Sequence, residues 1–200
     1  MNRREERMND PSRRVVVGIS GASGVIYGLE MLRVLKRLGY RGHAVITRDA
    51  RKTFLLETEY TLQEVEAAAA AVYDPDDLMA PISSGSFLTA GMVVIPCTIQ
   101  TLSAVAHSHD ANLLVRAADV TLKERRPLIL VVRETPLHQG HLRLMLDASS
   151  MGAVILPPVP AFYHRPKTIE DLVRHTVGKV LDCLRIPHDL FRRWEGPPAT

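Results

Sequence analysis

A glycine-rich turn between an apolar run and an amphipathic stretch constrains the fold of this chain most strongly. The apolar run is 15–19, the turn is Gly18-Ile19-Ser20-Gly21-Ala22-Ser23-Gly24, and the amphipathic stretch is 25–38. This order predicts a strand, a tight turn and a helix. In a parallel sheet it places a helix N-terminus, which favours an anion, at the carboxyl end of a strand. The turn therefore predicts a phosphate-binding site, and a purely structural turn is the alternative.

Further apolar strands, each followed by a helical stretch, are predicted along the rest of the chain. Because apolar strands alternate with helices, we expect a doubly wound, mostly parallel sheet with helices on both faces, a Rossmann-like or flavodoxin-like three-layer α/β/α fold. The alanine run 67–71 is expected to belong to a helix. The predicted strands are 15–19, 43–47, 92–95, 128–132 and 153–156, and the predicted helices are 25–38, 48–57, 61–71, a stretch after 98, 112–124, 137–150 and 168–184.

Composition indicates one globular domain. The 200 residues are 46% hydrophobic and 24% charged, which suits a single core over 14–200, preceded by a charged, disordered tail at 1–13. The net charge is only +3 and the basic residues are spread out, so we expect no nucleic-acid partner. No apolar run is long enough to cross a membrane, and residues 1–14 lack the apolar segment of a secretory signal.

The two cysteines and the histidines indicate no metal site. Cys97 and Cys183 are not at metal-ligand spacing, and their small number favours a reduced, cytoplasmic chain. His138 and His141 lie three residues apart, but no carboxylate pattern accompanies them. We therefore predict that no metal is bound.

The spacing of the glycines narrows the class of phosphate ligand. Glycines at 18, 21 and 24 match neither the dinucleotide fingerprint nor the P-loop. A dinucleotide site also needs an acid at the end of the second strand, where this chain has Thr47. Thr98 begins another helix at the same sheet edge, although N-capping alone would explain it. These hydroxyl groups favour a mononucleotide.

Charged residues mark two further places. Arg133 and Glu134 directly follow the strand 128–132, so both should lie at the same edge, where an arginine can bind phosphate and a carboxylate can move protons. A mutual ion pair is the alternative.

Arg116 and Lys123 are seven residues apart and lie on one face of a predicted helix, where they could bind phosphate together. The alternative is a solvated helix face on which their acidic neighbours, Asp119 and Glu124, neutralise them.

Taken together, these blocks resemble the flavin prenyltransferase family, the small partner of the polyprenyl-hydroxybenzoate carboxy-lyases. They occur in the family's order and cover about 14–194. Besides the glycine turn, the blocks are Ser83-Ser84-Gly85-Ser86, Pro96-Cys97, Arg116-Ala117-Ala118-Asp119-Val120, Leu122-Lys123-Glu124-Arg125-Arg126-Pro127, Arg133-Glu134-Thr135-Pro136 and Phe162-Tyr163-His164.

The resemblance implies an activity and partners. It implies a single FMN-binding domain in a homo-oligomer, commonly a dodecamer. It implies metal-independent transfer of a dimethylallyl group from dimethylallyl monophosphate to N5 and C6 of reduced FMN. The product, prenylated FMN, would pass to a separate decarboxylase, of the ubiquinone-biosynthesis type or acting on aromatic acids.

The resemblance also implies roles for individual residues. Glu134 would handle the proton, with Ser23 as a second catalytic residue. Thr47 stands where serine is frequent and keeps the hydroxyl, whereas Lys179 stands where arginine is frequent and loses the planar fork, which loosens its hold on phosphate. FMN would be held by Gly21, Ala22, Ser23, Thr47, Thr98, Ile99, Gln100, Thr101 and Arg133, and the donor phosphate by Arg116, Lys123, Tyr163 and Lys179.

Two other functions stay open at this point. An FMN-dependent cysteine decarboxylase can share this fold, although the blocks around Lys123 and Tyr163 argue against it. A non-catalytic flavin carrier or decarboxylase subunit is the second alternative. Turnover by the isolated protein separates the carrier from both enzymes.

Overall fold

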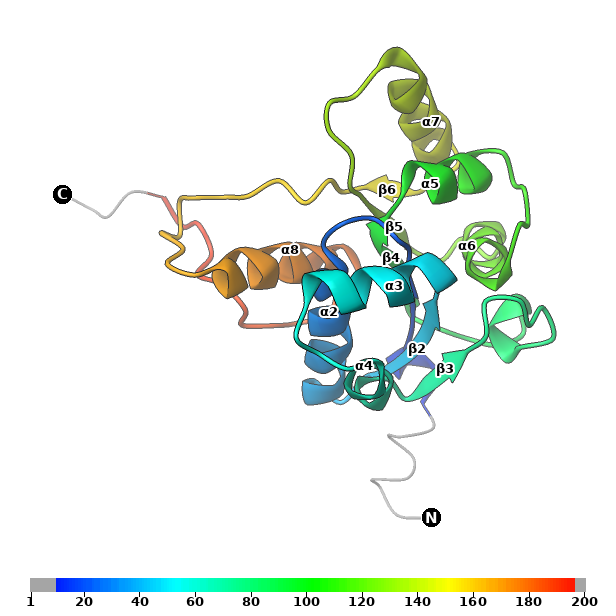
Figure 1. Ribbon diagram of the computed structural model, residues 1–200, viewed down its shortest axis with the longest axis horizontal. Helices are drawn as coiled ribbons and strands as arrows, with labels where there is room; N and C mark the ends of the chain where they lie inside the picture. Colours follow the sequence, from blue (N-terminus) through cyan, green and yellow to red (C-terminus); the bar gives the residue numbers. More distant parts are fainter. Residues whose placement is uncertain (1–9, 197–200) are drawn as a thin grey trace, which may run out of the picture.

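The computed structural model describes residues 10–196, which form a six-stranded sheet flanked by helices (Figure 1). Every neighbouring pair of strands is parallel, and the strand order is β3-β2-β1-β4-β5-β6. The predicted doubly wound α/β fold is therefore confirmed. The strands are β1 Arg14–Ile19, β2 Arg41–Ile46, β3 Ala71–Tyr73, β4 Gly91–Cys97, β5 Leu128–Val132 and β6 Val154–Ile155, and the α-helices are α2 Val25–Arg37, α3 Arg48–Glu57, α4 Leu62–Ala68, α5 Ile99–Ala106, α6 Leu113–Lys123, α7 Gln139–Ser150 and α8 Ile169–Cys183.

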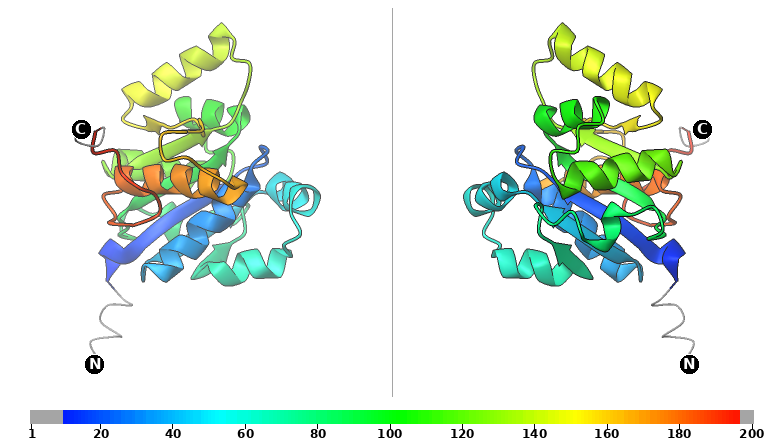
Figure 2. Two further views of the ribbon diagram at one scale, coloured as in Figure 1. Left: turned by 90° about the vertical axis from the view of Figure 1, so that its left-hand side faces the viewer. Right: turned by 90° about the vertical axis from the view of Figure 1, so that its right-hand side faces the viewer.

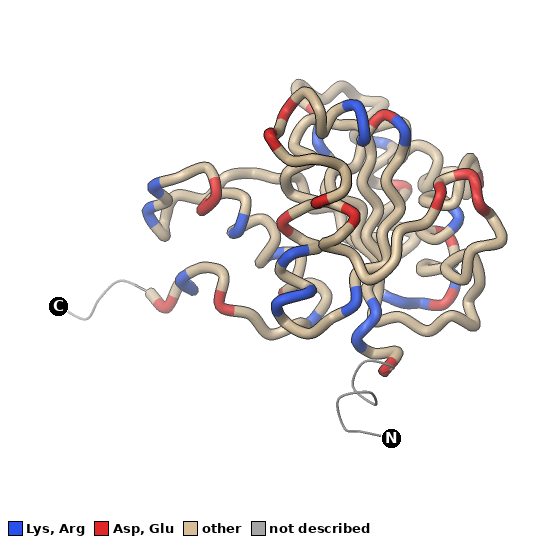
Figure 3. Tube along the Cα trace, turned by 60° about the horizontal axis from the view of Figure 1, so that its bottom comes forward, with Lys and Arg blue, Asp and Glu red and all other residues tan. Residues whose placement is uncertain are grey.

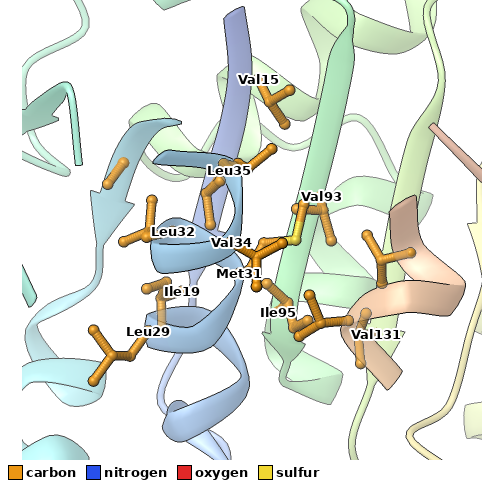
Figure 4. Close-up of a cluster of buried hydrophobic side chains, with 14 of the residues drawn as sticks. Val15, Ile19, Leu29, Met31, Leu32, Val34, Leu35, Val93, Ile95 and Val131 are labelled. Carbon is orange, nitrogen blue, oxygen red and sulfur yellow. The ribbon is translucent and has the colours of Figure 1, made fainter. Parts of the chain in front are cut away.

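Helices flank both faces of the sheet (Figure 2), and a hydrophobic core lies on each face. Side chains alternate along β1, so that Val15 and Val17 enter one core and Val16 enters the other. Helices α2, α3, α4 and α8 cover the first face, and α5, α6 and α7 cover the second. Figure 4 shows side chains of α2, among them Met31, packed against β1 and β4. Burial on both faces explains why the strands are apolar throughout.

Helix α2 packs directly against the sheet at one glycine. A Cβ at Gly28 would lie 2.7 Å from both Ile19 Cδ1 and the Ile95 carbonyl oxygen. The turn before the helix ends at Gly24, whose φ of +93° is a left-handed conformation that favours glycine. The predicted strand, turn and helix are thus confirmed, and their glycines set the distance between α2 and the sheet.

The prediction of a helix through the alanine run 67–71 is wrong. Helix α4 ends at Ala68, and β3 begins at Ala71 and pairs with β2. The N–H of Ala70 donates to the Gly42 carbonyl at 2.8 Å, so pairing with a neighbouring strand overrides the helix propensity of alanine. The segment between β3 and β4 contains the short 3-10 helix η2, Pro81–Ser83.

Both ends of the chain fall partly outside the described residues. Residues 1–9 of the predicted tail and residues 197–200 lie outside the described part of the chain. The rest of that tail contains a 3-10 helix, η1 Pro11–Arg13, capped by Asp10. Lys and Arg are interspersed with Asp and Glu over the trace (Figure 3). No helix between residues 10 and 196 is long and apolar enough to span a membrane.

Candidate functional site

A cavity of about 430 Å³ lies where the strand order changes direction, at the carboxyl ends of β1 and β4. In open α/β sheets this is the usual place for a ligand, and pockets for small molecules typically span roughly 300–1,000 Å³. The lining comes from the segments after β1, β2, β3 and β4 and from the start of α6: Ser20, Gly21, Thr47, Arg48, Asp49, Pro75, Asp76, Thr98, Gln100, Thr101, Ala104, Ala111, Asn112 and Val115.

Three helix N-termini meet at this cavity. Thr47 caps α3 by accepting the Ala50 N–H at 3.2 Å, and Thr98 caps α5 by accepting the Thr101 N–H at 3.1 Å. Asn112 caps α6 in the same way, and all three capping residues line the cavity. The caps leave the first N–H groups of each helix without an intrahelical partner. With three helix N-termini beside it, this end of the cavity favours an anion such as phosphate.

The two loops at the edge of the cavity are held together by Ser20. Its side chain is buried, and its hydroxyl donates to the Pro96 carbonyl at 2.9 Å. The same oxygen accepts the Thr98 N–H at 2.8 Å. This pair of hydrogen bonds fixes the end of β1 against the start of α5, so the cavity wall is set by buried contacts.

The glycine turn packs against α3 and binds a carboxylate from its far end. A Cβ at Gly21 would lie 2.7 Å from Asp49 Cβ, so only glycine fits there without a shift. The N–H of Gly24 donates to Glu57 Oε2 at 2.7 Å. The N-terminus of α2 therefore receives an anion from within the chain. Sequence reasoning missed Glu57, because nothing local links the last residue of α3 to a turn 33 residues away.

Five of the predicted flavin ligands line the cavity together: Gly21, Thr47, Thr98, Gln100 and Thr101. Sequence reasoning missed Arg48, Asp76 and Asn112, which complete the lining. Arg48 pairs with Asp76 across its rim. Only a cap-like position marked Asn112 in the sequence, and nothing marked Asp76, so the fold was needed to find them.

The other four predicted flavin ligands, Ala22, Ser23, Ile99 and Arg133, lie outside the lining of this cavity. The Arg133 N–H donates to the Cys97 carbonyl at 3.0 Å, which holds it beside the end of β4. Burial raises the pKa of the Tyr27 phenol, and the positive charge of Arg133 partly opposes this. The backbone of Arg133 therefore lies at the sheet edge where β4 ends.

The two predicted catalytic residues are both exposed. Glu134 Oε1 accepts the N–H of Thr135 at 2.9 Å, and Ser23 lies in the turn before α2. Among the described residues, no hydrogen bond links Glu134 or Ser23 to another predicted site residue. Both belong to segments at the carboxyl edge, which leaves their side chains accessible there.

The predicted cations of α6 are paired with acidic neighbours. Arg116 Nη1 lies 3.1 Å from Asp110 Oδ2 and 3.3 Å from Asp119 Oδ2. Lys123 Nζ lies 2.5 Å from Glu124 Oε1 and lowers the pKa of that carboxyl through a hydrogen bond and its charge. The predicted neutralisation by Asp119 and Glu124 is therefore confirmed within one chain.

The predicted donor ligands Tyr163 and Lys179 lie on a different face. Both are exposed along α8, which covers the first face of the sheet, whereas α6 covers the second. Lys179 Nζ lies 3.6 Å from Asp182 Oδ2. A second cavity, of about 310 Å³, includes Tyr163 in its lining along with four charged side chains. One chain therefore does not gather the four predicted phosphate ligands in one place.

Metal-ligand clusters are not seen in the described chain. Within residues 10–196, no three His, Cys, Asp or Glu side chains lie close enough together to hold a metal ion. The rings of His138 and His141 do lie close together, with centroids 3.6 Å apart and a tilt of 33° between their planes. His138 Nδ1 accepts the Gly140 N–H, so this ring serves as the N-cap of α7.

Known proteins place this chain among flavin enzymes. The model of the Flavoprotein family matches residues 3–181. The flavin prenyltransferase UbiX of Escherichia coli K12 is 56% identical over 187 residues, which cover 92% of this chain and 99% of that protein. The chain belongs to the flavin prenyltransferase family. It is therefore an enzyme of the transferase class, as the sequence blocks predicted.

Solved structures agree with this membership. A crystal structure of AnUbiX (PadA1), in complex with FMN and dimethylallyl pyrophosphate, has a TM-score of 0.91 and 46% identity and covers 92% of this chain and 98% of that one. A dodecameric FMN-dependent UbiX-like decarboxylase from Escherichia coli O157:H7 has a TM-score of 0.89 and 44% identity and covers 92% and 100%. The fold described above is thus shared with solved structures of UbiX-like flavin proteins.

Proposed function

We propose that this chain transfers a dimethylallyl group from dimethylallyl monophosphate to N5 and C6 of reduced FMN. The prenylated FMN would leave for a separate decarboxylase. The observation that carries the proposal is the cavity at the β1–β4 edge, where three helix N-termini converge in a member of the flavin prenyltransferase family. The AnUbiX structure, which contains FMN and dimethylallyl pyrophosphate, supports the choice of both ligands.

The cavity suits the phosphate and ribityl chain of FMN. Capped N-termini and side-chain hydroxyls (Thr47, Thr98 and Thr101) supply neutral donors around an anion. Asp49 and Asp76 also line the cavity, and each is paired with a cation, Lys52 and Arg48 respectively. Gly21 and Gln100 complete this group. The remaining predicted ligands, Ala22, Ser23, Ile99 and Arg133, would contact the ring system at the same edge. Reduced FMN supplies the nucleophilic atoms N5 and C6.

Cationic residues would stabilise the phosphate as it leaves the allylic carbon. Lys179, Arg116 and Lys123 carry the charge, and Tyr163 offers a hydroxyl. One pre-placed donor to developing charge is typically worth about 3 kcal/mol, so a cluster of them lowers the barrier substantially. Lys179 binds as a point charge and not as a fork, and its ammonium group lies 3.6 Å from Asp182 Oδ2.

A proton must leave C6 when the second bond to the flavin forms. Glu134 is exposed at the carboxyl edge and can take that proton as a general base. The released phosphate is the other candidate. Ser23, in the turn beside the cavity, would assist by orienting groups near N5.

A homo-oligomer would complete the donor site. Since α6 and α8 cover opposite faces of one chain, a neighbouring subunit is needed to bring all four phosphate ligands together. Large apolar side chains are exposed along α7 and near α8, including Leu146 at 65%, Phe162 at 68% and Ile169 at 74%. Such exposed groups indicate a protein interface. We propose a dodecamer in the cytoplasm, as the dodecameric relative suggests.

Anaerobic incubation with reduced FMN and dimethylallyl monophosphate tests the proposal. Mass spectrometry should detect a flavin heavier by one five-carbon unit, and a parallel reaction with the diphosphate compares the two donors. A reaction with a peptide ending in cysteine should give no decarboxylation. Unchanged FMN from folded, FMN-loaded protein would contradict the proposed function, and turnover of the cysteine peptide would favour the decarboxylase.

A further inference from the structure

We propose that His175 is a positioning residue that fixes the hydroxyl of Tyr163 for the phosphate of the prenyl donor. The proposal rests on the proposed function, because that function assigns Tyr163 to the donor. Tyr163 Oη lies 3.3 Å from His175 Nε2, and the two rings meet edge to face with centroids 5.8 Å apart. This hydrogen bond joins an irregular loop to a buried position of α8.

Tyr163 needs such a partner because its backbone has no regular secondary structure. It lies in the long crossing between β6 and α8, and its side chain is 46% exposed. The rings of His164, His175 and Trp194 surround it, but His175 supplies its hydrogen bond. Without this bond the phenol could rotate freely until the donor binds. Donor binding would then have to restrict that rotation, and the entropy lost would weaken the affinity for the donor.

His175 is held rigidly from two sides. It is 7% exposed on α8, the His164 ring stacks on it at 4.9 Å with an interplanar angle of 6°, and the Phe191 ring lies at 4.6 Å. Lys179 follows one helical turn later, so the imidazole and the ammonium group share one face of α8. His175 therefore places the Tyr163 hydroxyl on the same side of α8 as the cation that would bind the phosphate.

The protonation of His175 suits this role. Burial, and to a smaller extent the charges of His164 and Lys179, lower the pKa of His175, so the ring is neutral at pH 7. A neutral imidazole has one N–H, and with that proton on Nε2 it donates to the phenol oxygen. The phenol O–H is then directed away from His175 and stays available to donate to a phosphate oxygen.

Steady-state kinetics of four variants test the assignment. His175→Phe keeps an aromatic ring in the stack and removes Nε2, and Tyr163→Phe removes the hydroxyl. Each should raise KM for dimethylallyl monophosphate about tenfold, the effect of one hydrogen bond, with kcat changed less than twofold. The double variant should show no further rise. His175→Gln, whose amide reaches the position of Nε2, should restore most of the affinity.

FMN affinity and a second histidine provide the controls. All variants should bind FMN as the wild type does, and His109→Phe, at an exposed histidine beyond α5, should leave KM unchanged. An unchanged KM in His175→Phe, or additive effects in the double variant, would overturn the proposal.

Calorimetry separates a failure of this inference from a failure of the proposed function. Dimethylallyl monophosphate is titrated into protein that holds oxidised FMN, where no transfer occurs. If the wild type binds the donor but forms no prenylated flavin, the proposed function fails, and an affinity ratio of about ten between wild type and His175→Phe still supports the positioning role. Absence of donor binding by the wild type would overturn both.

Discussion

The two regions that carry the predicted ligands are built by different means. The cavity at the β1–β4 edge is shaped by backbone: helix N-termini, a glycine that packs against α3, and the buried Ser20 between two loops. The region along α8 is shaped by long side chains. There Asp182 contacts Lys179, His188 and Arg193, and the nearby Trp194 is 67% exposed.

This difference affects how much entropy each region loses when its ligand binds. Backbone N–H groups are held by the core and lose little entropy when a ligand arrives, whereas lysine and arginine side chains lose much more. We therefore expect the flavin cavity to form in each folded chain. We expect the donor region to depend on side-chain partners and on a neighbouring subunit.

The largest effect should come from Glu134, which follows β5 at the carboxyl edge of the sheet. Glu134→Gln keeps the shape and removes the base, so turnover should fall roughly a thousandfold while FMN binding is unchanged. Single-turnover kinetics and a flavin fluorescence titration measure the two quantities. Normal turnover would assign the proton to the released phosphate.

A substitution at Lys179 tests whether the α8 region acts independently of the cavity. Lys179→Ala should lower kcat/KM for the donor about a hundredfold, as expected for one lost charge contact, and leave FMN affinity intact. Lys179→Arg, which supplies a planar guanidinium fork, should have a kcat/KM for the donor at least as high as that of the wild type. An equal loss of FMN affinity in Lys179→Ala would show that the two regions are one site.

Lowering the pH should reduce the free energy of unfolding of the chain through a histidine in the sheet that supports both regions. Burial, with the charges of Arg41 and Arg14, lowers the pKa of His43 to about 4 from an ordinary value of 6.5. The unfolded chain then binds more protons between these values, so stability is present above pH 6.5 and is lost as the pH falls toward 4. Between pH 7 and pH 4.5 the free energy of unfolding should fall by about 2 kcal/mol.

Urea unfolding at both pH values measures this loss. The phenyl ring of His43→Phe can still pack beside Tyr73 and Phe87. In this variant the difference in unfolding free energy between the two pH values should be smaller by about 2 kcal/mol. If the variant keeps the full acid sensitivity, other groups are responsible. Because His43 lies in β2, away from the lining of both cavities, FMN and donor affinities at pH 7 should be unchanged.

The smallest effect distinguishes capping from ligand binding. Thr98→Ala and Thr61→Ala each remove an N-cap and should cost about 1 kcal/mol of stability. Only Thr98→Ala should weaken FMN binding, because Thr61 caps α4 away from the cavity. Thermal melts with and without FMN measure both effects. Equal loss of FMN affinity in the two variants would remove Thr98 from the ligand set.

Much of the fold follows from the sequence because its signals are local. The continuous apolar run at 128–132 predicts the buried strand β5 with its bounds. The helix predicted from residue 61 does begin there as α4, where Thr61 forms a capping box with Glu64. The edge strand β3 was missed because three half-buried residues carry no pattern of their own. Their conformation depends on pairing with β2, which is a long-range contact.

The site was only partly predictable for the same reason. Residues next to strand ends, such as Thr47 and Thr98, could be placed at one edge from strand order alone. Asp76 and Glu57 reach the edge through the course of whole segments, and no spacing signals them. The separation of Arg116 from Lys179 also needs the structure, because it depends on which face each helix covers.

A crystal structure of the protein with FMN and dimethylallyl monophosphate tests the division into two regions most directly. We predict the FMN phosphate in the β1–β4 cavity, hydrogen-bonded to N–H groups in the first turns of the helices capped by Thr47, Thr98 and Asn112. The donor phosphate should lie against Tyr163 and Lys179, with Arg116 from a neighbouring subunit. An FMN phosphate bound along α8, or a donor phosphate in the β1–β4 cavity, would contradict the account.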